Sequence, residues 1–158
     1  MQNSQKVVGS NALDRRQWLS VLAKAPAQEI KAAWARLECA PDGVELRAPE
    51  TGMVMVRGRV GGAGSSFNLG EMTVTRCAMR LDSGETGVGY AAGRDKEHAR
   101  IAAIVDAMMQ SENLRPLAEQ TVVMPLAKAA LDRRSLAARK TASTKVEFFT
   151  LVTGRQPK

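Results

Sequence analysis

The sequence has few of the residues from which metal centres and disulfide frameworks are built. Its 158 residues include one histidine and two cysteines, Cys39 and Cys77, and neither cysteine belongs to a C-x-x-C pair. A zinc site takes four such ligands at characteristic spacings, which a lone histidine and two distant cysteines do not supply. We therefore expect no metal site within this chain.

Long apolar runs are also missing. None reaches the roughly 18 residues that a membrane helix needs, and the first ten residues, MQNSQKVVGS, lack the apolar core of an export signal. We expect a cytoplasmic protein without a membrane segment, whose cysteines stay reduced.

Acidic residues are outnumbered, since 23 Lys and Arg oppose 16 Asp and Glu and give a net charge of +7. This surplus favours an anionic partner, which is a nucleic acid, a phosphorylated ligand, a membrane surface or an acidic protein. The basic residues are scattered rather than gathered in one tract, so composition alone does not select among these partners.

Motifs for nucleotide binding and nucleophilic catalysis are incomplete. Residues 57–67, RGRVGGAGSSF, lack the Gly-Lys-Ser/Thr ending of a phosphate loop, and a strand pattern follows them instead of a helix. We interpret the glycines as a hairpin turn. The alternative is a nest of backbone N–H groups that holds an anion together with Arg57 and Arg59. His98, beside Arg94 and Asp95, is either a general base or an ordinary helix residue.

Hydrophobic periodicity predicts four helices. Apolar residues recur at helical spacing in 11–26 and 27–37, which we expect to form a helical hairpin with Trp18 and Trp34 in the core. Helices are also predicted at 94–110, where Asp95 is placed to cap, and at about 127–143. Two prolines exclude one long helix from the intervening stretch, where residues 122–124 are a candidate edge strand.

Between these helices the period changes to two and predicts an antiparallel β-meander over residues 44–92. Turns are expected at 49–52, 61–64 and 82–87, and residues 145–152 predict a final strand. Gly87 and Gly89 leave one side of their strand bare, which suits close packing. We predict one α+β domain over 11–154, with an N-terminal helical hairpin, an antiparallel β-meander, further helices and a C-terminal strand, between tails 1–10 and 155–158.

The same alternation sorts the arginines. One pair shares a strand face with Met53 and Met55, and a second pair shares a face of the next long strand. We expect these arginines to form a basic surface that either screens a triphosphate held by a partner or, as we favour, pairs with acidic residues of a partner. The candidate anion- or partner-binding residues are Arg57, Arg59, Arg76, Arg80, Arg94 and His98.

Four stretches together resemble one protein family. They are RRQWLSVLAKA (15–25), PETGMVMVRGRVGGAGSSFNLGEMTVTRCAMRL (49–81), GYAAGRDKEHARIAAIVDAMMQ (89–110) and TKVEFFTLVTG (144–154). In order and spacing they are similar to the PhnG family, the G subunits of bacterial carbon-phosphorus lyase. The resemblance runs from about Asp14 to Gly154, and its matching residues, such as His98 and Asp106, carry no established catalytic role.

The resemblance implies a component of a phosphonate-degrading core complex, with the H, I and J subunits and the L protein as partners. That system forms ribose 1-methylphosphonate 5-triphosphate from ATP and methylphosphonate and releases adenine. Because the family's chemistry is attributed to the I and J subunits, this chain is expected to be inactive alone and to hold no cofactor, with ATP as a substrate of the complex.

Two other hypotheses stay open. One is a free-standing basic domain that binds anions or nucleic acid, and the other is a small catalytic domain that uses His98 with Arg94 and Asp95. Self-association of the isolated chain is also open, with the strand edge at 145–152 as the expected contact.

Overall fold

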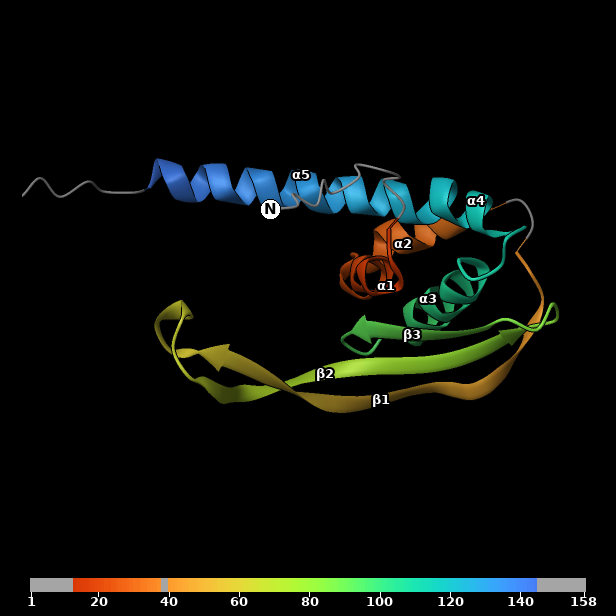
Figure 1. The fold of residues 1–158 in the computed structure, drawn as a ribbon, viewed down its shortest axis with the longest axis horizontal. Coiled ribbons are helices and arrows are strands. Elements are labelled where there is room, and N and C mark those ends of the chain that lie inside the picture. The colour runs from red at the N-terminus through yellow and green to blue at the C-terminus, as the bar shows by residue number, and fades with distance from the viewer. Residues whose placement is uncertain (1–12, 38–39, 145–158) are drawn as a thin grey trace, which may run out of the picture.

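A computed structural model describes residues 13–37 and 40–144, which form an α+β fold (Figure 1). A three-stranded antiparallel sheet is covered on one face by helices, and its other face carries no helix among these residues. The predicted tails and the predicted strand at 145–152 lie outside the described residues.

The first two helices match the predicted ranges. α1 (Arg15–Lys24) begins at a capping box, in which the Asp14 carboxylate accepts the Gln17 N–H and the Gln17 side chain accepts the Asp14 N–H. α2 (Ala27–Trp34) follows directly after Pro26. Trp18 is buried and Trp34 is partly buried. Both helices pack against α3 (Lys96–Met108), and α1 also lies directly on the sheet beside α3.

The sheet consists of β1 (Gly43–Arg59), β2 (Ser66–Leu81) and β3 (Thr86–Ala92) in the order β1-β2-β3, which confirms the meander. The predicted turn at 49–52 is wrong, because β1 continues through it. Register shifts on either side of Arg47 absorb the extra residues as bulges. Pro49 is tolerated there because β1 is an edge strand that need not donate every N–H.

Helix α3 packs unusually close to the sheet. A Cβ atom on Gly89 would overlap the backbone oxygen of Ala99, and one on Gly87 would overlap that of Ala103. The bare side that was predicted for β3 is therefore filled by α3. Asp95 caps this helix as predicted, since its carboxylate accepts the N–H of His98 at 3.0 Å.

The chain after α3 stays helical. α4 (Arg115–Ala118), a π-helical segment (Glu119–Val123) and α5 (Met124–Ser143) follow one another without a break. The candidate edge strand at 122–124 is therefore wrong. Pro116 and Pro125 each stand within the first two positions of a helical segment, where a missing N–H costs little. Val122 and Val123 are buried in the core, and this burial stabilises the helical conformation of the segment.

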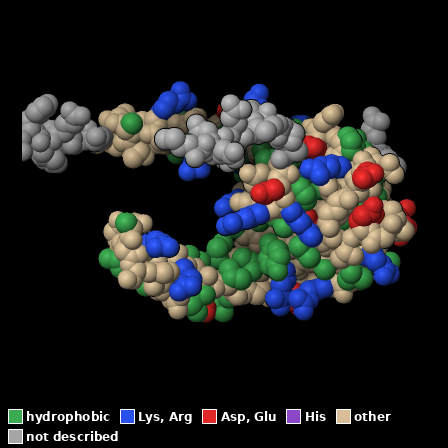
Figure 2. Space-filling view, in the orientation of Figure 1, with side chains coloured by type: hydrophobic (Ala, Val, Ile, Leu, Met, Phe, Trp, Pro, Cys, Tyr) green, Lys and Arg blue, Asp and Glu red, His purple; other side chains and the backbone are tan. Residues whose placement is uncertain are grey.

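Two elements extend past the body of the molecule in the same direction. They are the distal part of the β1–β2 hairpin and the C-terminal half of α5, whose residues 131–144 are all exposed. Figure 2 shows a hollow between them, open to one side. None of the described helices combines the length and the apolar character that a membrane crossing requires.

Candidate partner-binding surface

We call residues 52–73 the hairpin arm. Its strands pair from Met53 opposite Thr73 to Arg59 opposite Ser66, and Gly61 and Gly62 at the tip have positive φ values of 59° and 81°. Left-handed backbone of this kind is what glycine supplies at tight turns, so the predicted hairpin turn is confirmed. The arm is a two-stranded ribbon, because β3 ends at Ala92 opposite Val74, where the arm begins.

The inner face of the arm carries Met53, Met55, Arg57 and Arg59. Cross-strand partners share a face, and Thr51, which lies opposite buried Thr75, belongs to this same series. The inner face is therefore the continuation of the face that α3 covers in the body, and it borders the hollow in Figure 2. Without a helix above them, the side chains of Met53 and Met55 are 69% and 55% exposed.

The outer face of the arm is apolar too. Val54 lies opposite Met72, and Phe67 lies opposite Gly58, on the face that no described helix covers. Val54 is 41% exposed and Phe67 is 42% exposed. Across both faces and the tip, the exposed large apolar residues of the arm are Met53, Val54, Met55, Val60, Phe67, Leu69 and Met72.

Such a ribbon has little to stabilise it by itself. None of the arm's side chains belongs to the buried core of the described residues, and an isolated two-stranded hairpin is marginal in water. Contiguous exposed apolar residues on a soluble protein mark contact surfaces. Fully burying one such side chain contributes about 1.5–3 kcal/mol, so a partner that covered the arm would gain substantially.

The predicted basic surface is divided by the sheet. The parity of both arginine pairs is as predicted, but Arg57 and Arg59 lie on the inner face, whereas Arg76 and Arg80 lie on the outer face. Arg76 is also occupied, since its Nε donates to Glu50 at 2.6 Å. The five arginines therefore do not present one surface to one ligand.

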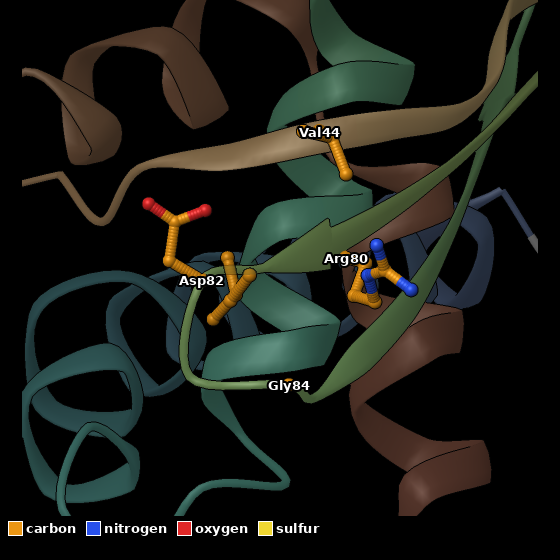
Figure 3. Close-up of a pocket in the computed structure, with 5 residues that line it drawn as sticks. Val44, Arg80, Asp82 and Gly84 are labelled. Atoms are coloured by element: carbon orange, nitrogen blue, oxygen red, sulfur yellow. The ribbon is translucent and has the colours of Figure 1, made fainter.

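Arg80 lines a shallow depression of about 540 Å³ with Val44, Leu81, Asp82 and Gly84 (Figure 3). It lies where β1 begins and β2 ends, at the opposite end of the hairpin from the tip. Arg80 and Asp82 do not point toward each other. The depression carries charges of both signs and no array of donors converging on one point, so its chemistry favours no particular anion.

The structure places His98 away from the surface, against its proposed role as a binding or catalytic group. Its side chain is 2% exposed, and its Nε2 lies 2.7 Å from the carbonyl oxygen of Leu22 in α1. Arg94 is exposed in the turn before α3. The two residues are therefore not brought together, and His98 ties α3 to α1.

A buried carboxylate that the sequence analysis left without a role organises the same layer. Asp106 is fully buried, and its oxygens accept bonds from Arg15 Nε at 3.2 Å, Arg15 Nη2 at 2.7 Å, Trp18 Nε1 at 2.8 Å and the Val88 N–H at 2.9 Å. It thus joins α1, α3 and β3. The signal that could have found it is an acidic residue within the apolar pattern of a helix.

The remaining reactive groups of the described residues form no catalytic or metal-binding arrangement. Burial raises the pKa of the Cys77 thiol, which stays protonated and contacts the carbonyl oxygen of Arg47 at 3.4 Å. No three His, Cys, Asp or Glu side chains cluster as metal ligands within 13–37 and 40–144. Every buried polar side-chain atom in this part of the chain has a hydrogen-bond partner.

Comparisons with known proteins agree with the sequence motifs. Residues 13–154 match the family described as phosphonate metabolism protein PhnG. The chain is also 46% identical over 141 residues to the protein named alpha-D-ribose 1-methylphosphonate 5-triphosphate synthase subunit PhnG from Rhizobium meliloti (strain 1021). That alignment covers 89% of this chain and 89% of the relative.

Proposed function

The chain belongs to the PhnG family of phosphonate metabolism proteins, and from this premise we propose that it is a subunit of ribose 1-methylphosphonate 5-triphosphate synthase. The observation that carries the proposal is the 46% identity to a protein of that name, over 89% of both chains. A match of this extent leaves no separate domain of the relative unaccounted for.

In this proposal the complex displaces adenine from ATP by methylphosphonate, with ATP as its substrate. The H, I and J subunits and the L protein are the proposed partners, and the I subunit supplies the nucleosidase chemistry. This chain supports the complex structurally. Two buried polar residues stabilise the fold of this chain and are not arranged for catalysis. His98 and Asp106 bond to other helices and strands rather than face a cavity.

The hairpin arm supports an assembly role over the alternative of nucleic-acid binding. Nucleic-acid surfaces are dominated by phosphate contacts from Lys and Arg, whereas the arm exposes seven large apolar side chains and two arginines. Methionine and phenylalanine are enriched at protein interfaces.

Adenine release tests the proposal. The partner proteins are incubated with ATP and methylphosphonate, with this chain present and with it omitted, beside the chain alone. We expect adenine only from the full mixture. Release by the chain alone would contradict the assembly role, and equal release without the chain would show that it is not a required subunit.

The nucleic-acid alternative would instead be favoured by binding of DNA or RNA that is measurable at physiological ionic strength and that weakens steeply as the salt concentration is raised further.

A further inference from the structure

Resting on the proposed function, we propose that the hairpin arm inserts into an apolar groove with a carboxylate-bearing rim on a different subunit of the synthase. The arm lies outside the body's core, and both of its faces carry exposed apolar side chains. A flat partner surface would cover one face only. A groove, or a pair of elements that close around the arm, covers Met53 and Met55 on one side and Val54 and Phe67 on the other.

The charge of the arm selects the chemistry of the rim. Arg57 and Arg59 stand side by side on the inner face, toward the tip, and neither forms an ion pair within the described part of the chain. Glu71 is the single acidic residue of the arm. Arginine pairs bidentately with carboxylates, so a partner that buries the apolar residues meets these guanidinium groups best with Asp or Glu.

A second copy of this chain is poorly suited to that role. Its net charge is +7, and many of its carboxylates already hold a basic partner. The acidic residues that are engaged in ion pairs are Glu29, Glu45, Glu50, Asp95, Glu97, Asp106 and Glu119. The carboxylates of the rim are therefore assigned to a heterologous subunit rather than to self-association.

Helix α5 extends the same surface across the hollow. Its exposed half carries Leu131 and Leu136 together with the basic residues Arg134, Arg139 and Lys140. The two projections are thus alike in chemistry, since both combine exposed apolar side chains with a surplus of positive charge. An element of the partner that fills the hollow in Figure 2 would contact both.

The first test removes the arm from the full-length chain. Residues 54–72 are replaced by Asn-Gly, a turn that joins the paired residues Met53 and Thr73. Because the core lies elsewhere, we expect the urea-unfolding midpoint to stay near that of the unaltered chain, whereas co-purification with co-expressed H, I and J subunits is lost. Co-purification of the truncated chain at the unaltered stoichiometry would overturn the proposal.

The second test changes charge and leaves the backbone alone. We expect R57E/R59E to weaken binding to the partner subunits by about tenfold or more. The exposed Arg16 and Arg36 supply the matched control, because R16E/R36E makes the same change of net charge on the body. Binding by R57E/R59E that equals binding by R16E/R36E would overturn the acidic rim.

A third variant identifies the carboxylates. R57K keeps the charge and introduces an amine, which a carbodiimide couples to a carboxylate in contact with it. We expect a cross-link to an Asp or Glu of another subunit at this position. A cross-link between two copies of this chain, or a homodimer that the arm truncation abolishes, would assign the arm to self-association and overturn the proposal.

The outcomes separate the two levels of argument. If the unaltered chain fails to co-purify with any synthase subunit, the proposed function fails and the inference falls with it. If the unaltered chain co-purifies and the truncated chain does so equally well, the proposed function stands and only the role of the arm is wrong.

Discussion

The body and the hairpin arm are parts of one sheet that use the same residue types in opposite ways. In the body, Gly87 and Gly89 admit the backbone of α3 so closely that no side chain fits. In the arm, a Cβ on Gly52 or Gly70 would meet nothing within 4 Å. The two glycines of β3 therefore serve internal packing, whereas Gly52 and Gly70 leave surface open.

The polar groups show the same contrast. Within the body, Arg15 pairs with the buried carboxylate of Asp106, and Arg76 pairs with Glu50. Within the arm, Arg57 and Arg59 have no acidic partner in the described structure. The comparison teaches that these two arginines of the body are satisfied within the described fold, whereas the two arginines of the arm are left for another surface to pair.

Loss of the buried carboxylate should have the largest effect on the body. We expect D106A to lower the free energy of unfolding by about 3–5 kcal/mol, because it leaves the Arg15 guanidinium, the Trp18 Nε1 and the Val88 N–H without their acceptor. Urea denaturation measures this change. The exposed Asp82 supplies the control in D82A, which should change stability by less than about 0.5 kcal/mol, and equal losses for both would refute the account of Asp106.

A pair of methionines tests the contrast within one residue type. Met79 is buried under α3, so M79A should cost about 2–5 kcal/mol of unfolding free energy. Met53 on the arm is 69% exposed, and M53A should stay within about 0.5 kcal/mol. Similar losses in thermal or urea unfolding would show that the arm belongs to the folding core after all.

A pair of glycines tests the close approach of α3. G89A would force the sheet and α3 apart and should cost about 1–3 kcal/mol or more. G70A on the arm adds a methyl group to open space, and we expect no loss of stability from it. Hydrogen exchange of the α3 amides should rise in G89A and stay unchanged in G70A, and the reverse order would contradict the packing described above.

The smallest expected effect is electrostatic. The N–H of His98 and, to a lesser extent, Lys31 lower the pKa of Asp95 below its ordinary value of 3.8. A depressed pKa adds stability above the unfolded-state value, and that stability is lost as the pH falls through the folded-state value. D95N keeps a capping side chain without the charge. We expect the unaltered chain to exceed D95N in unfolding free energy by about 1 kcal/mol or less at pH 6. This difference should narrow as the pH falls from 6 to about 3.

A gap between the unaltered chain and D95N that stayed constant over this range would contradict the assignment of Asp95 as a charged cap.

Much of the body was predictable, because local rules and burial agree there. Asp14 and Asp95 mark two helix starts, and the bare sides of Gly87 and Gly89 predicted close packing, which α3 supplies. The turn at 49–52 was predicted wrongly, since Pro49 and Gly52 are turn residues locally, and the long pairing of β1 with β2 overrides them through bulges.

Less of the candidate site could be predicted from the sequence. Alternation gave the correct face for each arginine pair, but it could not tell that the two faces lie on opposite sides of one sheet. The sequence left His98 open between a general base and an ordinary helix residue, and only the tertiary contact with Leu22 shows that it is buried. In the sequence the arm looks like an ordinary hairpin. Only the structure shows that the described helices end before they cover it.

The most direct test of the central claim is adenine release from ATP and methylphosphonate by the partner subunits, supplied with the unaltered chain, the arm-truncated chain or neither. We predict full release with the unaltered chain, and with the truncated chain no more than when the chain is omitted, although its body unfolds at an unchanged urea midpoint. Full release with the truncated chain would contradict the account, because the arm would then be dispensable for the assembly that we assign to it.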